Sequence, residues 1–300
     1  NAYLLHITDE KDLAGLPQTS IDAAVQLARG RDLDGWAFSL QAPSYGPFMQ
    51  YADNRDLRYQ MFMASSTRAS NGNDRDNREI LKQIANLRLE RAVLLGYPTH
   101  ADFVLEQRMA ETPARVEQLL SQLLEAARPR AGQELSDVTE IARSLGFTDE
   151  IMPWDWSYYS EKLRQKQYDL DQELLRPYFE LERVKQGIFS LTNKLWGLNY
   201  VKNEQIPVYH PDVDVYEVYE SDGSFLAILY LDFFPREGKS PGAWMTSFRI
   251  QHKKDGQDVR PLISVVCNFS KPTENQPSLL TFNEVRTFLH EFGHALHGMF

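Results

Sequence analysis

Cysteine is nearly absent from this sequence: Cys267 is the only one among 300 residues. An internal disulfide is therefore impossible, and the cysteine usage gives no sign of an oxidising compartment. Cys267 follows the apolar run Leu262-Ile263-Ser264-Val265-Val266, so we expect a buried and inert thiol. Long apolar runs are missing as well, which argues against a membrane as a partner.

Positive charge is also scarce, with 32 Lys and Arg residues against 42 Asp and Glu residues and a net charge of −10. Because no basic stripe is visible, nucleic acid is not expected as a partner. The sequence has no internal repeat, no low-complexity tract and no signal-like amino terminus. We expect a soluble protein of the cytoplasm or the periplasm, without disulfides.

Residues 1–200 have helical periodicity and predict a helical region. Apolar residues recur at helical spacing over 78–95, and Gly96-Tyr97-Pro98 is a typical stop for that helix. Thr112 and Pro113 predict the start of another helix, as an N-cap followed by a first-turn proline. Its expected apolar stripe is Val116, Leu119, Leu120, Leu123 and Leu124.

Two more helices are expected over 161–168 and 181–195, and Met152-Pro153-Trp154 is expected to form a loop. An aromatic cluster in this region has two interpretations, a substrate platform or packing between helices. Packing is favoured, because buried aromatic side chains dominate core energetics. The cluster consists of Trp154, Trp156, Tyr158 and Tyr159.

Residues 201–300 predict a second region, a small sheet followed by one helix. Apolar and polar residues alternate from 211 to 220, as in a half-buried strand, and Asp222-Gly223 is a strong hairpin signal before a returning strand over 225–233. Two further strands are expected over 244–250 and 262–269, with a turn at Asp255-Gly256 between them. The fold class is therefore mainly α, with a small, largely antiparallel β-sheet before the last helix.

That last helix carries the motif His290-Glu291-Phe292-Gly293-His294, which is H-E-x-x-H. Residues four apart lie on one face of a helix, so both imidazoles can bind one Zn²⁺, and Glu291 can act as the general base. A pair of ordinary surface or core histidines is the alternative interpretation. The local context favours the metal site, since Thr281 and Glu284 have the spacing of a capping box for a helix.

The expected buried face of this helix consists of Phe282, Val285, Leu289 and Phe292. Gly293 is unfavourable inside a helix, and a close approach of another backbone is one reason to tolerate it. His297 comes three residues after His294, whereas the extended motif with a third histidine requires six. We therefore expect His297 to pack or to support a ligand rather than to bind the metal.

Several segments together resemble the thimet oligopeptidase family of zinc metallopeptidases, and within it the bacterial peptidyl-dipeptidase (dipeptidyl carboxypeptidase) branch. The resemblance covers most of the chain from about residue 42 onward. The combination is much more specific than the zinc motif alone. The segments are Arg68-Ala69, Arg108-Met109-Ala110-Glu111-Thr112-Pro113, Pro153-Trp154-Asp155-Trp156, Asp169-Leu170-Asp171, Pro177-Tyr178-Phe179, Ile206-Pro207-Val208-Tyr209-His210-Pro211, Gly238-Lys239-Ser240-Pro241-Gly242-Ala243-Trp244-Met245, Cys267-Asn268-Phe269 and 279–298.

The resemblance implies a two-lobed zincin-type peptidase that admits short unstructured peptides. It implies one Zn²⁺ per complete protein, with His290 and His294 as ligands and Glu291 as the general base. The family's third ligand is a Glu from a helix beyond the second His, and its substrate-binding Tyr and His groups lie further on, so none of these is expected in this chain. The remainder of the same polypeptide is the expected partner, and the catalytic region within 201–300 is expected to be incomplete.

Release of carboxyl-terminal dipeptides is the function expected from this resemblance. An endo-oligopeptidase and a non-catalytic, peptide-binding helical scaffold are the alternatives. Gly242, Ala243 and Trp244 are candidate substrate-binding residues on a strand, although Gly242 could equally serve only a turn. Residues 1–300 alone are expected to bind zinc weakly and to cleave nothing, unless an upstream residue such as His210 or Glu284 completes the site.

Overall fold

The computed structural model describes residues 3–169, 172–274 and 276–300, so Leu170 and Asp171 of the Asp169-Leu170-Asp171 segment lie outside the described residues. The fold is mainly α with a small, mostly antiparallel sheet, as expected. Contacts divide the chain into two compact units, Asn1–Leu57 with Arg164–Phe300 and Arg58–Leu163. The division near residue 200 rests on sequence pattern alone and stays a prediction.

The first unit begins with a two-stranded sheet that the sequence did not predict. Strand β1 (Leu4–Ile7) pairs antiparallel with β2 (Trp36–Ser39), and each has four residues, too few for a clear alternating pattern. The short helix η1 (Glu10–Leu13), α1 (Gln18–Arg29) and α2 (Ala42–Tyr51) complete this part.

The principal sheet of the first unit has five strands in the order β3-β4-β5-β9-β6. Its strands are β3 (Asn199–Lys202), β4 (Val213–Tyr219), β5 (Phe225–Asp232), β6 (Trp244–Arg249) and β9 (Leu262–Val266). Only the β5–β9 pair is parallel. The turn expected at Asp255-Gly256 belongs to a separate hairpin, β7 (His252–Lys254) with β8 (Gln257–Val259), between β6 and β9 in the chain.

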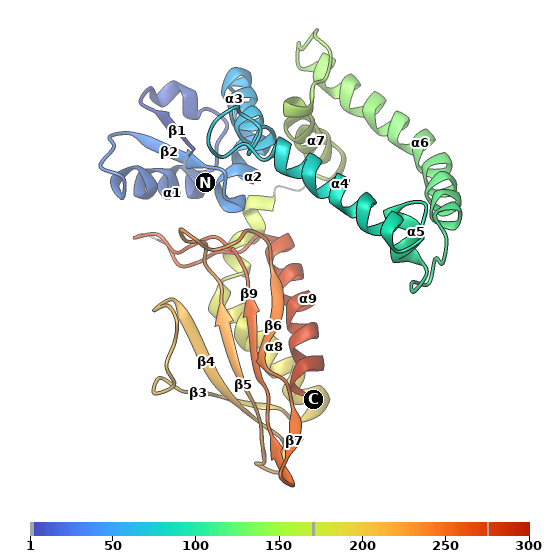
Figure 1. Ribbon diagram of the computed structural model, residues 1–300. Helices are drawn as coiled ribbons and strands as arrows, with labels where there is room; N and C mark the ends of the chain where they lie inside the picture. The colour runs from blue at the N-terminus through green and yellow to red at the C-terminus, as the bar shows by residue number, and fades with distance from the viewer. Residues whose placement is uncertain (1–2, 170–171, 275) are drawn as a thin grey trace. The chain divides into compact units, whose positions relative to one another are not determined.

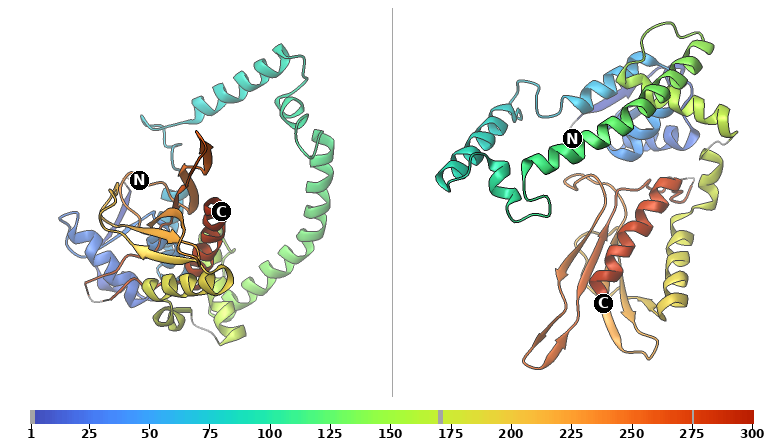
Figure 2. Two further views of the ribbon diagram at one scale, coloured as in Figure 1. Left: turned by 90° about the horizontal axis from the view of Figure 1, so that it is seen from below. Right: turned by 90° about the vertical axis from the view of Figure 1, so that its right-hand side faces the viewer.

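Two helices, α8 (Leu181–Trp196) and α9 (Phe282–Met299), pack on the same side of this sheet, as Figures 1 and 2 show. The short helix η2 (Gln172–Tyr178) precedes α8. Apolar side chains of α8, α9, β4, β5 and β9 form one buried cluster, which includes Ile188, Phe189, Leu229, Ile263, Phe288 and Phe292. This cluster fixes α9 on the sheet and thereby places the helix that carries the histidine motif.

The second unit is helical, with α4 (Arg78–Leu94), α5 (His100–Leu105), α6 (Pro113–Ser144) and most of α7 (Pro153–Tyr168), while α3 (Arg55–Ser66) joins the two units. The predicted start at Thr112 is confirmed, because its side chain accepts a hydrogen bond from the amide of Arg115. The predicted apolar stripe of α6 is exposed in the described structure: Leu119, Leu120, Leu123 and Leu124 are 55–58% exposed.

The expectation of a loop at Met152-Pro153-Trp154 is wrong beyond Met152, because Pro153 is the first residue of α7. Proline is well suited to the first turn of a helix, where its missing N–H is not needed. Three members of the aromatic cluster pack as expected: the Trp154 ring lies 4.7 Å from that of Tyr59, and the Tyr159 ring lies 5.1 Å from that of Phe147 and 5.0 Å from that of Tyr158. For Trp156 the expectation is wrong, because this side chain is 39% exposed. Among the described residues, no helix is both long enough and apolar enough to cross a bilayer.

Candidate metal centre

Helix α9 begins where the sequence predicts. The Thr281 hydroxyl accepts a hydrogen bond from the Glu284 amide at 3.1 Å, and the Glu284 carboxylate accepts one from the Thr281 amide at 2.7 Å. This reciprocal capping box satisfies two amide groups that the first turn would otherwise leave unpaired. The same carboxylate accepts a hydrogen bond from the amide of Ser270 at 2.8 Å, so Glu284 also ties the helix to the segment after β9.

The buried face of α9 differs from the predicted one. Phe288, Phe292, Ala295 and Met299 are buried, whereas Phe282 is 48% and Leu289 is 45% exposed. Phenylalanine and leucine occur on more than one side of this helix, so spacing alone admits two apolar faces. Contact with the sheet selects the face that contains Phe288, and only Phe292 and the partly buried Val285 of the predicted set belong to the packed surface.

His290 and His294 lie on the exposed side of α9, one turn apart. Their Nε2 atoms are 3.2 Å apart, and the ring planes meet at 85°. Two ligands at about 2.0–2.1 Å from a tetrahedral zinc ion stand roughly 3.4 Å from each other. The two imidazoles therefore fit a shared metal ion with little movement, and neutral imidazole is a preferred ligand of zinc.

Glu291 follows His290 directly and is buried, with 9% of its surface exposed. Burial is the main cause that raises the pKa of the Cys267 thiol, and the negative charge of Glu291 adds to this increase. The thiol is therefore held neutral, and Cys267 is the buried, inert cysteine that the sequence predicts.

A third ligand for a metal at His290 and His294 is missing from the part of the chain that the structure describes, where no three His, Cys, Asp or Glu side chains cluster around a possible ion. Glu284 is engaged in the capping box. His210 belongs to a turn in which its Nδ1 atom accepts a hydrogen bond from the Asp212 amide at 3.2 Å. Neither Glu284 nor His210, the two upstream candidates, forms a cluster with His290 and His294 that could hold a metal ion.

The glycine that permits close packing of α9 is Gly298, not Gly293. A Cβ atom on Gly298 would lie 3.0 Å from both Ile263 Cδ1 and Met245 Cε. At Gly293 a Cβ atom would meet nothing within 4 Å among the described residues, so the expected close approach is absent there. His297 is exposed, and the expected packing role is not seen among the described contacts.

Strand β6 lies at one edge of the five-stranded sheet, beside α9 (Figure 1). Among the described residues, β9 is its only strand partner, so its other side is open to a further chain. Gly242 and Ala243 directly precede it, and Trp244 is its first residue. Gly242 has φ +99°, a left-handed conformation that favours glycine, although a Cβ atom there would have open space.

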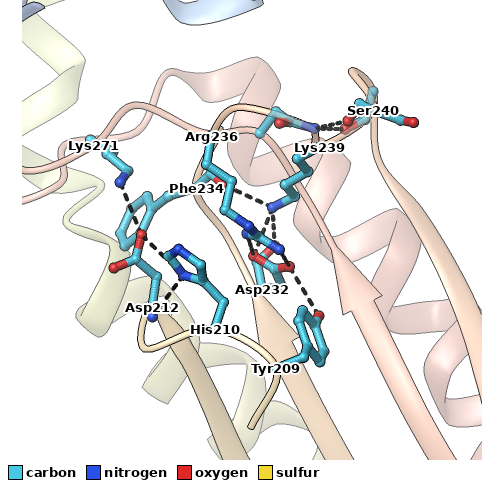
Figure 3. Close-up of polar contacts among 11 residues, drawn as sticks. Tyr209, His210, Asp212, Asp232, Phe234, Arg236, Lys239, Ser240 and Lys271 are labelled. Atoms are coloured by element: carbon cyan, nitrogen blue, oxygen red, sulfur yellow. Dashed lines mark hydrogen bonds and ion pairs between the residues drawn. The ribbon is translucent and has the colours of Figure 1, made fainter.

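Sequence reasoning missed a buried charge cluster in the segment that leads from β5 to β6 (Figure 3). The Asp232 carboxylate, 1% exposed, accepts hydrogen bonds from Arg236, from Lys239 and from the Tyr209 hydroxyl at 2.7–2.9 Å. Burial alone would raise the pKa of Asp232, but the hydrogen bonds from Arg236 and Lys239 hold it below its ordinary value. An aspartate at the end of an apolar strand, followed by two cations, was the available signal.

A cavity of about 370 Å³ lies elsewhere in the first unit. It is lined by α1, by the start of α2 and by residues from two segments, 235–237 and 270–279. Neither the histidine motif nor Gly242, Ala243 and Trp244 contribute to its wall. This cavity is therefore not the groove in which a peptide would meet the histidine pair.

The sequence of the chain matches a known protein family. The sequence profile of peptidase family M3 matches residues 48–300, the greater part of the chain, and this range includes the histidine motif. The chain belongs to peptidase family M3. The resemblance inferred from the sequence is thereby confirmed.

Several known proteins are similar to this chain along nearly its whole length. Oligopeptidase A of Escherichia coli is 39% identical over 298 residues, 98% of this chain and 44% of that protein. Dipeptidyl carboxypeptidase of the same organism is 38% identical, with 99% and 44% covered. The Thimet-like oligopeptidase of Dictyostelium discoideum is 28% identical, with 96% and 44% covered. The chain thus spans less than half the length of these relatives.

Proposed function

We propose that the full-length protein containing this chain is a zinc peptidase that releases dipeptides from the carboxyl end of short, unstructured peptides. The observation that carries the proposal is the pair of Nε2 atoms 3.2 Å apart on α9, with a buried carboxylate between the two histidines in the sequence. Membership of peptidase family M3 supports it, as does the similarity to Oligopeptidase A and to Dipeptidyl carboxypeptidase.

His290 and His294 are assigned as two ligands of the zinc ion, and Glu291 as the general base. A zinc ion held there would supply Lewis acidity, which would polarise the scissile carbonyl and make water reactive near neutral pH. Glu291 accepts a proton from the attacking water and passes it to the leaving amine. The third ligand is assigned to the remainder of the polypeptide, since the described residues do not provide it.

The peptide is placed along the open edge of β6, next to Gly242, Ala243 and Trp244. An extended peptide can add to such an edge by main-chain hydrogen bonds, which recognise backbone shape with little dependence on sequence. The position of β6 beside α9 supports this placement, because Met245 of the strand contacts the helix near Gly298.

Removal of the metal tests the proposal. The full-length protein should lose peptide hydrolysis when a chelator removes zinc and regain it when zinc is restored. His294→Ala should lose both the bound metal and the activity, because it removes one of the ligands. His297→Ala is a matched control, since His297 lies on the same helix three residues later and is exposed. Hydrolysis that survives the chelator would overturn the assignment.

An endo-oligopeptidase is the second candidate, because Oligopeptidase A and Dipeptidyl carboxypeptidase are almost equally similar to this chain, at 39% and 38% identity. A peptide with a free carboxyl terminus and the same peptide with an amidated terminus separate the two. A dipeptide-releasing enzyme needs the free carboxylate and should leave the amidated peptide intact. Internal cleavage of both peptides would favour the endo-oligopeptidase.

A further inference from the structure

The chain beyond β9 stays attached to the segment that follows β5. The Cys267 amide donates a hydrogen bond to the Asp232 carbonyl at 2.7 Å, and the Phe269 amide donates one to the Phe233 carbonyl at 2.8 Å. The backbone on both sides of Asn268 is thereby fixed. The Asn268 side chain is half-buried and starts from a rigid base.

That side chain reaches the segment that leads into β6. Asn268 Nδ2 donates hydrogen bonds to the Ser240 carbonyl at 3.0 Å and to the Gly242 carbonyl at 2.7 Å. The backbone register between β6 and β9 ends at the pair of Trp244 and Val266. The amide of Asn268 therefore continues the connection between the two segments where the backbone ladder has stopped.

The other end of the same segment is held by Lys239, as Figure 3 shows. Its Nζ atom donates to the Asp232 carboxylate at 2.7 Å, to the Asp232 carbonyl at 3.1 Å and to the Phe234 carbonyl at 2.8 Å. The Lys239 side chain is only 4% exposed. Residues 232–239 are thus anchored internally, and the short stretch from Ser240 to Gly242 depends on Asn268.

We propose that Asn268 is a positioning residue for peptide binding, which holds the Ser240 and Gly242 carbonyls so that the open edge of β6 is preformed. This inference rests on the proposed function, in which the peptide adds to that edge. A peptide bound by main-chain hydrogen bonds needs donors and acceptors at fixed places, and an edge that must first become ordered binds more weakly. Gly242 is the residue where fixation matters most, because its backbone is left-handed and the strand begins two residues later.

The test is a comparison of steady-state kinetics in the full-length protein. Asn268→Ala should raise KM about tenfold, the effect expected from losing two neutral hydrogen bonds, while kcat and the zinc content stay close to those of the unmodified protein. Asn268→Asp has the same shape but places a carboxylate oxygen against the two carbonyl oxygens, so it should raise KM at least as much as the alanine variant. Asn268→Gln keeps the donor on a longer side chain and should recover part of the loss.

Asn199 offers a matched control at the opposite edge of the sheet. Its Nδ2 atom also donates to two backbone carbonyls, those of Gly197 at 3.0 Å and Glu220 at 3.5 Å, and it begins strand β3. Asn199→Ala should leave KM unchanged, because β3 is not the proposed peptide edge.

Different results separate this inference from the proposed function. If the unmodified protein shows no zinc-dependent hydrolysis, the proposed function fails and the positioning role fails with it. If hydrolysis is normal but Asn268→Ala leaves KM unchanged, or lowers kcat alone, only the positioning role is overturned. An equal rise in KM for Asn199→Ala would also overturn it. Should Asn268→Ala fail to fold, the Asn268→Asp and Asn268→Gln pair decides, since equal KM values for those two would contradict a role of the donor.

Discussion

Two glycines in the segment before β6 have left-handed φ angles, 79° at Gly238 and 99° at Gly242. At both positions a Cβ atom would meet nothing within 4 Å among the described residues. A side chain at either position therefore strains the backbone without a collision, at a cost of about 1–2 kcal/mol. Gly242 lies close to the start of the edge strand β6 along the chain, whereas Gly238 lies further from it.

Gly242→Val should raise KM or lower turnover of the full-length protein several-fold, while the fold survives. Gly238→Val should cause a similar loss of stability with little change in KM, because Lys239 anchors that part of the segment to Asp232. Steady-state kinetics and thermal unfolding of both variants check this. Full activity in Gly242→Val would mean that Gly242 serves only the turn.

Asp232 is a buried carboxylate of the first unit that pairs with two cations, Arg236 and Lys239. Its neutral substitute Asp232→Asn leaves the buried Lys239 ammonium without a counter-charge, and breaking such a pair costs about 3–5 kcal/mol. Asp258→Asn is a suitable control, since Asp258 is 45% exposed and pairs with Arg260 at the surface, where solvent screens the ion pair and its loss should change stability little. Urea unfolding of both variants at neutral pH compares the two losses.

The lowered pKa of Asp232 implies that the stability of the protein depends on pH. The pKa of Asp232 is lower in the folded state than its ordinary value of about 4, so folding favours the charged carboxylate. Its contribution is complete above that ordinary pKa and is lost as the pH falls through the lower, folded-state pKa. The stability difference between the unmodified chain and Asp232→Asn should therefore shrink in acid. A difference that stays constant down to pH 2 would contradict this account of the cluster.

At the level of elements, α9 contains two glycines, Gly293 and Gly298, whose replacement by alanine should change stability in opposite directions. Gly293 is exposed in a helix interior, so Gly293→Ala should raise the free energy of unfolding by about 1 kcal/mol. Gly298→Ala places a Cβ atom 3.0 Å from Ile263 and Met245, which overpacks the contact of α9 with β9 and β6. This substitution should lower the free energy of unfolding by about 1–3 kcal/mol. Urea unfolding measures both, and equal signs for the two substitutions would show that the packing of α9 has been misjudged.

The elements also show how far sequence reasoning reaches. Local signals predicted the capping box at Thr281 and Glu284 and the hairpin at Asp222-Gly223, because each depends on a few adjacent residues. The phase of α9 was not predictable, since both Leu289 and Phe288 suit a buried face and only contact with β9 decides between them. The parallel pairing of β5 with β9 depends on contacts between segments far apart in the chain, which leave no short pattern. Arg236 and Lys239 follow Asp232 closely in the sequence, but only the structure shows that the three side chains are buried together.

At the level of the whole molecule, the proposed zinc site takes only His290 and His294 from the described residues, whereas a catalytic zinc normally has three protein ligands. Residues 1–300 produced alone should therefore bind zinc more weakly than the full-length protein by more than about 100-fold, the upper range for losing a group that merely supports a ligand. They should also cleave no peptide. Calorimetric zinc titration beside a cleavage assay checks both expectations, and tight one-to-one binding with turnover would place the third ligand inside this chain.

The proposed mechanism rests on three residues of one helix: metal binding is assigned to His290 and His294, and proton transfer to Glu291. The most direct measurement is the zinc content and peptide turnover of the full-length protein with Glu291→Gln. The substitution keeps the size of the side chain and removes the base, so zinc content should be unchanged while turnover falls by at least about 100-fold. Peptide hydrolysis retained at the unmodified rate, with zinc still bound, would contradict the assignment of Glu291 and with it the proposed mechanism.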